Sequence, residues 1–221
     1  REIESRLERY EELARRETRI MSELPDEMLP AYYQLVHYPY KGSQLLNAMT
    51  LSAQQQRFYA RRSMAEALRL KDLSKSYGDS LVTLTEGYNN LLGGKWNGMM
   101  SLAYGGARGF DRASLLDVNL KPGSSFGIIT ENDEGGVFRV LPEFYDNVDR
   151  PHFFDICSTG TEPVEWNIET SEPWLKLDRI SGMTGYRDRV NVSVDWGNVP
   201  DGANKAYITV SAAGRDETVL V

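Results

Sequence analysis

The apolar residues of this chain change their spacing near residue 111, and this change constrains the fold more than any other feature. Before that point they recur every three or four positions, the repeat of an amphipathic helix. After it they alternate with polar residues, the repeat of a half-buried strand. The sequence therefore predicts an α+β protein of two domains. A helical bundle is expected over residues 1–110 and an antiparallel, immunoglobulin-like β-sandwich over 150–221, with a connecting segment over 111–149.

Helix boundaries in the first half are predicted from proline and glycine. Pro39 should push Tyr38 into an extended conformation and interrupt the helical pattern. A long helix is expected over residues 43–72, and Gly78 should mark a break or a turn. The glycine pair at 93–94 should end the last helix, as a C-terminal cap does.

In the second half, the connecting segment should hold a hairpin that pairs residues 126–130 with residues 137–141. The chain starts within a helical pattern and stops within a strand pattern, so we expect it to be a piece of a longer protein. Trp196 is also expected on the apolar face of its strand. The other residues expected in the sandwich core are Trp166, Ile168, Val190, Val192, Val194, Ile208 and Val210.

Composition argues against several classes of function. Residues 1–110 carry 15 Lys and Arg against 13 Asp and Glu, and residues 111–221 carry 10 against 19. Such an acidic second half argues against binding nucleic acid. No apolar run approaches the roughly 20 residues of a membrane span. The lone Cys157 and the distant His37 and His152 argue against a metal site, and no motif calls for a cofactor.

Two groups of residues have both a structural and a functional interpretation. Acidic residues near the expected hairpin could bind calcium or act as an acid and base, but a solvated turn explains them without function. They are Glu131, Asp133, Glu134 and Glu143. Trp166, Trp174 and Trp196 could stack on sugars, but core packing is the simpler interpretation for Trp166 and Trp196.

Two loops carry more aromatic and cationic residues than a connection needs. Tyr38 and Lys41 lie at a helix entrance, and Asn89, Lys95 and Trp96 lie around the glycine pair. A lysine beside tyrosine hydroxyls can bind an anionic sugar, because the lysine pairs with the carboxylate and the hydroxyls bind the ring. The alternative is an ordinary corner between helices. If the helices that carry the two loops are antiparallel neighbours, both loops lie at one end of the bundle.

The same loops resemble a known family. The stretch 37–47, HYPYKGSQLLN, is similar to the "YP-x-K-x-S-x-x-x-N" stretch of glycoside hydrolase family 115, the xylan α-glucuronidases. The stretch 88–100, with YN, GGKW and MM, resembles a later stretch of that family. Residues 160–166 and 171–175 resemble its sandwich region. The resemblance implies a bundle and sandwich that follow a catalytic α/β barrel, with the catalytic carboxylates in that barrel.

Two functions follow as hypotheses. The first is a non-catalytic accessory portion of a xylan α-glucuronidase-like enzyme, inactive alone, with Tyr38, Lys41, Asn89, Lys95 and Trp96 as substrate contacts. The alternative is a carbohydrate-binding or adhesion module in which the sandwich binds polysaccharide. The expected partners are the missing barrel of the same polypeptide and a glucuronoxylan-type polysaccharide, and the chain is compatible with a homodimer. The substrate class leads us to expect a periplasmic or extracellular location.

Overall fold

The computed structural model describes residues 2–101, 113–133, 139–148 and 150–221. The chain forms two compact units. The helical unit comprises Arg1–Arg57 and Leu70–Leu116, and the sandwich unit comprises Phe58–Arg69 and Asp117–Val221. Helices in the first part of the chain and antiparallel sheets in the second confirm the predicted α+β class.

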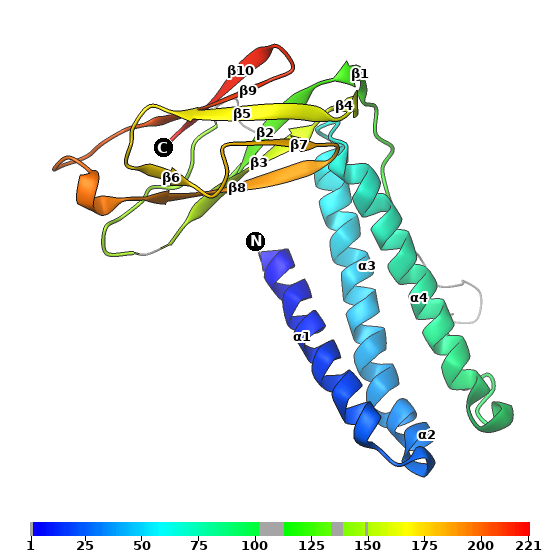
Figure 1. Ribbon diagram of the computed structural model, residues 1–221. Helices are drawn as coiled ribbons and strands as arrows, with labels where there is room; N and C mark the ends of the chain where they lie inside the picture. The colour runs from blue at the N-terminus through cyan, green and yellow to red at the C-terminus, as the bar shows by residue number, and fades with distance from the viewer. Residues whose placement is uncertain (1, 102–112, 134–138, 149) are drawn as a thin grey trace. The chain divides into compact units, whose positions relative to one another are not determined.

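The helices run in order through the first 94 residues (Figure 1). A 3₁₀ turn, η1, and a π-helical turn, η2, separate some of them. None of the helices in the described parts of the chain combines the length and apolar character needed to cross a membrane. The elements are α1 (Glu2–Glu23), η1 (Asp26–Met28), α2 (Leu29–Tyr32), η2 (Tyr33–His37), α3 (Tyr38–Ala60) and α4 (Glu66–Gly94).

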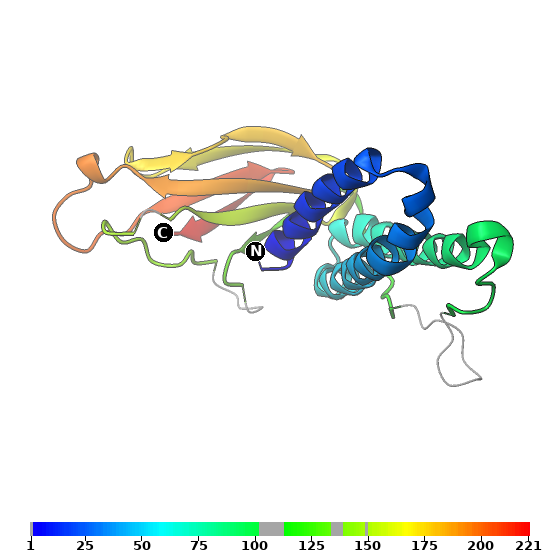
Figure 2. The same cartoon turned by 90° about the horizontal axis from the view of Figure 1, so that it is seen from below.

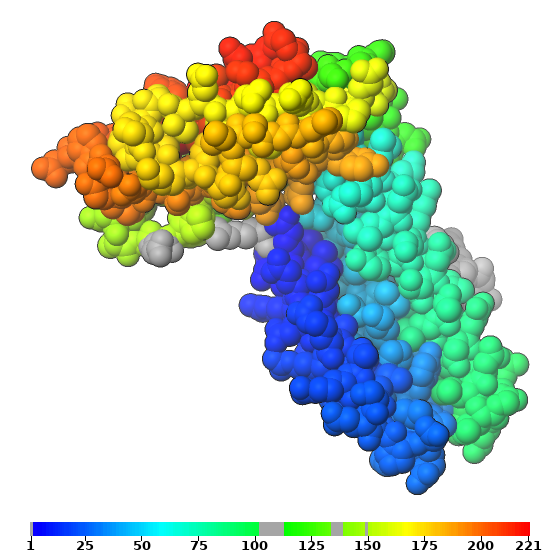
Figure 3. Space-filling view, in the orientation of Figure 1, coloured from blue at the N-terminus to red at the C-terminus, as the bar shows by residue number. Residues whose placement is uncertain are grey.

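Helix α1 is amphipathic but none of its residues is buried. Its side chains are uncovered along the face seen in Figure 3. Two polar contacts hold it to the following helices: the Tyr40 hydroxyl donates to the Tyr10 carbonyl at 2.9 Å, and His37 Nδ1 lies 2.8 Å from Glu17 Oε1. The helix is therefore fixed by a few side chains more than by a deep core.

Helices α3 and α4 run antiparallel, side by side in both views (Figures 1 and 2). The Ser74 hydroxyl on α4 donates to the Met49 carbonyl on α3 at 3.0 Å, and Gly42 faces the side chains of Leu81 and Leu84. These contacts form the centre of the helical unit. One buried cluster of this unit consists of Leu45, Leu81 and Leu84, with Tyr33, Tyr38 and Tyr77 packed against it.

Pro39 does not interrupt the helix, contrary to the prediction. Tyr38 has helical angles of φ −60° and ψ −51°, and Pro39 is the second residue of α3. A proline ring collides with the carbonyl four residues earlier and offers no N–H to it. The wider π-helical turn η2 lies at this point and accommodates such a defect without ending the helix.

The predicted helix over residues 43–72 is two helices. Helix α3 ends at Ala60, and α4 begins at Glu66 after a turn in which Ser63 has a positive φ of 52°. The Ala65 N–H donates to the Ser158 carbonyl at 2.8 Å, so a long-range contact stabilises the break. Gly78, the predicted break, lies inside α4. The predicted end at the glycine pair is confirmed, since Gly93 and Gly94 have positive φ.

The sandwich unit contains two four-stranded sheets whose strand pairs are all antiparallel, with strand orders β10-β9-β5-β7 and β2-β3-β8-β6. Strands β1 and β4 form a separate parallel pair. The strands are β1 (Lys121–Ser124), β2 (Phe126–Thr130), β3 (His152–Ser158), β4 (Gly160–Glu162), β5 (Val164–Thr170), β6 (Leu175–Leu177), β7 (Ser181–Thr184), β8 (Arg187–Val194), β9 (Tyr207–Ala212) and β10 (Arg215–Leu220), with the 3₁₀ turn η3 (Trp196–Asn198) between β8 and β9.

Alternating side chains from the two sheets fill the core, as the period of two predicts. The predicted core is confirmed: Trp166, Ile168, Val190, Val192, Ile208 and Val210 are buried, and Val194 packs against them. Trp196 is the exception. It lies in η3, beyond the end of β8, and is 39% exposed because the alternation stops with the strand.

The predicted hairpin partner of residues 126–130 lies partly outside the described residues, and its described part pairs with Leu220 rather than with β2. Strand β2 pairs with β3, from Phe126↔Ser158 to Thr130↔Phe154. Residues 134–138 lie outside the described part of the chain, but Val140 forms a parallel bridge with Leu220. A sheet of the sandwich unit thus begins upstream of residue 150, where the sequence placed its start. The acidic turn after β2 suggests a partner close in sequence, but β2 pairs with β3, which lies further along the chain.

Candidate functional site

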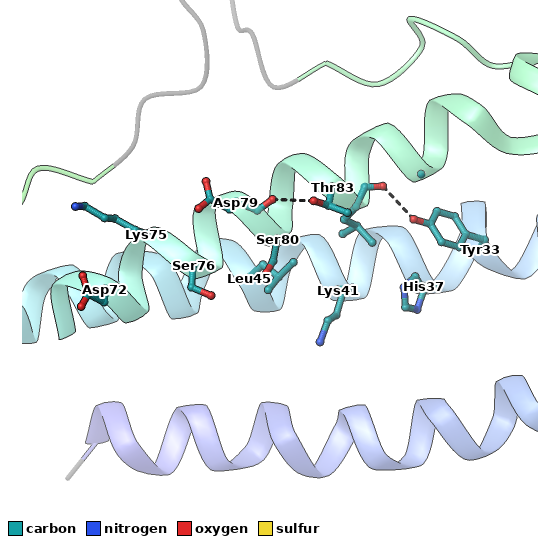
Figure 4. Close-up of a pocket in the computed structure, with 12 residues that line it drawn as sticks. Tyr33, His37, Lys41, Leu45, Asp72, Lys75, Ser76, Asp79, Ser80 and Thr83 are labelled. Carbon is teal, nitrogen blue, oxygen red and sulfur yellow. Dashed lines mark hydrogen bonds between the residues drawn. The ribbon is translucent and has the colours of Figure 1, made fainter. Parts of the chain in front are cut away.

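A groove of about 730 Å³ runs along the helical unit (Figure 4). Residues of η2 and α3 form one side and residues of α4 form the other. Both walls mix polar and charged side chains with the edge of the buried leucine cluster. The lining residues are Tyr33, His37, Lys41, Leu45, Asp72, Lys75, Ser76, Asp79, Ser80, Thr83, Leu84 and Gly87.

Tyr33 crosses from η2 to α4 at one end of the groove. Its hydroxyl donates to the Leu84 carbonyl at 3.0 Å. A Cβ on Gly87 would lie only 2.6 Å from the Tyr33 hydroxyl oxygen. Gly87 is therefore required for this close approach. Burial, with a smaller contribution from Tyr38, raises the pKa of Tyr33, so the phenol stays a neutral donor.

Lys41 and His37 both line this groove. Their side chains extend from the same side of the helix, away from α4 and toward α1 (Figure 4). Lys41 Nζ donates to Gln44 Oε1 at 2.8 Å, which uses one of its three N–H groups. His37 is held by Glu17 through Nδ1. Such a surface can bind a hydroxyl-rich ligand and can place an ammonium group beside a carboxylate.

Tyr38, the first predicted contact residue, is mainly a packing residue. Its ring lies 4.8 Å from the ring of Tyr88, and its hydroxyl lies 3.3 Å from the Thr85 hydroxyl oxygen. Both partners are on α4. The structure therefore brings the stretch that begins α3 against the stretch that ends α4, while Tyr38 itself is not among the residues that line the groove.

Asn89, Lys95 and Trp96 organise the loop after α4. The Asn89 amide donates to the Met100 carbonyl at 2.8 Å and accepts from the Met100 N–H at 3.1 Å, which closes the loop. Lys95 Nζ lies 5.0 Å from the centre of the Trp96 ring. Trp96 Nε1 is buried without a hydrogen-bond partner in the described residues. Of the five predicted contact residues, Lys41 alone lines the groove.

A cluster of buried charges in the sandwich unit was not predicted. The Asp155 carboxylate accepts from Arg189 Nε at 2.8 Å and from Arg187 Nη1 at 3.3 Å. The nearly buried Glu66 accepts from Arg69 Nε at 2.9 Å and forms an ion pair with Arg187 at 3.7 Å. The single aspartate inside the apolar run of β3 was the signal that could have revealed it, because a buried carboxylate needs a cationic partner.

This charge cluster attaches residues 58–69 to the sheet. Arg187 Nη1 also donates to the Tyr59 hydroxyl at 3.2 Å. Burial, and then the Asp155 carboxylate, raises the pKa of Tyr59. Burial alone would lower the pKa of Arg187, but Asp155, Tyr59 and Glu66 outweigh it and raise the pKa. Burial likewise raises the pKa of the Cys157 thiol, which keeps it protonated and unreactive. The cluster is architectural.

Comparison with known proteins gives partial likenesses. No family model and no curated protein matches the chain. Part of it is similar to a family 5 xyloglucanase from Bacteroides ovatus, a glycoside hydrolase solved with a XXXG heptasaccharide. The identity is 29%, over 32% of this chain and 14% of that one, with a TM-score of 0.24. The PapD-like domain 7 of human CEP192 is 12% identical over 48% of this chain and 91% of that domain, with a TM-score of 0.30. Neither likeness is extensive enough to assign a function.

Proposed function

We propose that this chain is the accessory, non-catalytic portion of a glycoside hydrolase similar to the family 115 xylan α-glucuronidases. In this proposal the helical unit lies beside the substrate site of a catalytic barrel in the same polypeptide. The substrate is a glucuronoxylan-type polysaccharide, so the enzyme works in the periplasm or outside the cell. A second copy of the enzyme is a further partner in this proposal.

The strongest support for the proposal is the contact between the two stretches that resemble the family. The two stretches that resemble the family lie far apart in sequence, and the Tyr38 and Tyr88 rings bring them into contact with centroids 4.8 Å apart. Lys41 lies one helical turn further along α3 and lines the groove. An ammonium group in a partly enclosed groove favours a carboxylate more than one in open water does, and a uronate supplies that carboxylate.

The alternative, a sandwich that binds polysaccharide through a flat row of tryptophans, has little support from the tryptophans. Trp166 is fully buried and Trp174 is 6% exposed. Only Trp196 of the three has a substantially exposed ring. One ring does not make a platform for several sugars, so we place the accessory role first.

The first test is the complete gene product, which should encode a barrel-sized domain in addition to this chain. The purified chain alone should release no glucuronic acid from a xylan oligosaccharide, because hydrolysis needs two carboxylates placed on either side of the bond. Release by this chain would contradict the proposal.

The second test measures the role of the lysines in the complete enzyme. Lys41→Ala and Lys95→Ala should each lower kcat/KM on a glucuronoxylan oligosaccharide by about tenfold or more, with little change in melting temperature. Lys205→Ala, which removes an exposed lysine from the sandwich unit, is the matched control. Loss of stability with unchanged turnover would instead assign the two lysines to architecture.

A further inference from the structure

A buried carboxylate organises a second pocket, located in the sandwich unit. Glu131 was expected to be solvated at a hairpin tip, but its side chain is only 9% exposed. Its Oε2 atom lies 2.8 Å from His152 Nδ1, and its Oε1 atom accepts from Arg150 Nη2 at 2.7 Å. One carboxylate therefore fixes the positions of both a histidine and an arginine.

The pocket beside these residues has a volume of about 430 Å³. Arg150 and His152 provide its polar side. Phe144 packs edge-on against His152 with ring centroids 4.6 Å apart, and the exposed Tyr145 supplies a second aromatic ring. The lining residues are Pro142, Glu143, Phe144, Tyr145, Val148, Arg150 and His152. The volume falls within the range of small-ligand sites, about 300–1,000 Å³.

The polar groups are oriented before any ligand arrives. Glu131 holds His152 through Nδ1, so any ligand contact must use the other ring nitrogen, Nε2, or the ring edge that lines the pocket, and the side chain as a whole is 7% exposed. Arg150 has five N–H donors, and its side chain is 51% exposed although one donor is committed to Glu131. Both side chains line the pocket. A ligand thus meets a fixed donor and a fixed imidazole rather than mobile side chains.

The charges select the class of ligand. Glu131 neutralises Arg150, and the lining Glu143, which accepts a hydrogen bond from the Tyr145 hydroxyl, adds a negative charge. This balance disfavours an anion. A neutral pyranose fits better, because its hydroxyls both donate and accept while its C–H face packs on an aromatic ring. We infer that this pocket, formed by Tyr145, Arg150 and His152, binds a neutral pyranose unit of a polysaccharide.

This inference does not depend on the proposed role of the helical unit. It concerns another unit and predicts a neutral sugar, whereas the groove is proposed to meet a uronate. If Lys41→Ala and Lys95→Ala leave turnover unchanged, the inference about this pocket still stands. If no neutral sugar binds in this pocket, the proposed accessory role still stands.

Saturation-transfer and chemical-shift NMR on this chain test the inference with xylohexaose, cellohexaose and mannohexaose, and with glucuronic acid for comparison. At least one neutral hexasaccharide should bind, with shifts at Tyr145 and His152. Tyr145→Ala should weaken binding by about tenfold, whereas Tyr145→Phe, which keeps the ring, should retain it.

Tyr186→Ala is the matched control. Tyr186 is also exposed, and its carbonyl accepts from the Ser158 N–H at the end of β3 opposite to His152. This variant should bind as the unchanged chain does. Three outcomes would overturn the inference: none of the hexasaccharides binds at millimolar concentration, glucuronic acid binds more tightly than all of them, or the two alanine variants lose affinity equally.

Discussion

The two units bury their apolar residues to very different depths. In the sandwich unit, side chains such as Trp166, Val192 and Ile208 are fully enclosed between two sheets. In the helical unit, α1 has no buried residue, and Leu13 and Ile20 on its apolar stripe remain nearly half exposed. A stripe at helical spacing therefore predicts a helix without predicting that the stripe is covered. The sandwich should be sensitive to small changes in shape, and the helical unit should tolerate them.

The largest effect should come from a charge in the sandwich core. Val192→Asp places a carboxylate at a fully buried position of β8, where the cross-strand neighbour His152 is already held by Glu131, and should cost at least about 4 kcal/mol of unfolding free energy. Ser193→Asp, on the exposed face of the same strand, should cost less than about 1 kcal/mol. Thermal unfolding followed by tryptophan fluorescence measures both. An unchanged melting temperature for Val192→Asp would mean that the register of β8 is wrong.

A smaller effect should come from one added methyl group. A Cβ on Gly182 would lie 2.5 Å from Cζ2 of the enclosed Trp166 ring, so Gly182→Ala should cost about 1–3 kcal/mol. Gly185, three residues later, has no neighbouring atom within 4 Å of the added carbon, and Gly185→Ala should be nearly neutral. Urea unfolding of the two variants tests the comparison. Equal midpoints would show that the sandwich can adjust as easily as the helical unit.

The smallest effect should have the opposite sign. In α3, a Cβ on Gly42 would meet Leu81 and Leu84 at an ordinary 3.9 Å, so Gly42→Ala should raise the unfolding free energy by about 0.5–1 kcal/mol through helix propensity. Gly87→Ala is the internal control, because its Cβ must displace the Tyr33 hydroxyl and so forfeit the gain. Circular dichroism at the helical band reports both. Destabilisation by Gly42→Ala would mean that the helical unit is packed as tightly as the sandwich.

The fold class and the sandwich core could be predicted because both depend on the local alternation of apolar residues. The break at Ser63 could not, because a hydrogen bond to Ser158, far along the chain, stabilises it. Pro39 misled for a similar reason: a π-helical turn accommodates a proline that the local rule places at a helix boundary. Trp196 misled because the alternation continues in sequence one step beyond the end of β8.

In the candidate sites, too, contacts that depend on long-range pairing could not be predicted from the local sequence. Lys41, which lines the groove, could be singled out because a lysine directly after two tyrosines within four residues is unusual in its own right. The pairing of Glu131 with His152 was missed because it depends on β2 lying beside β3, a partner that the acidic turn concealed. Charges that meet through strand pairing become visible only when the register is known.

The chain passes between its two units three times, since residues 58–69 belong to the sandwich unit while both flanking segments belong to the helical unit. During synthesis, this segment leaves the ribosome before any strand of the sheet that will receive it. The ion pair between Glu66 and Arg187 can form only after Arg187, more than a hundred residues later in the chain, has been synthesised. Neither unit can be excised with a single cut, so a sandwich expressed from residue 117 onward would leave Asp155, Arg187 and Arg189 without the helical residues that complete their network. A separable sandwich therefore requires residues 58–69 to be supplied as well, as a fused segment or as a peptide added in trans.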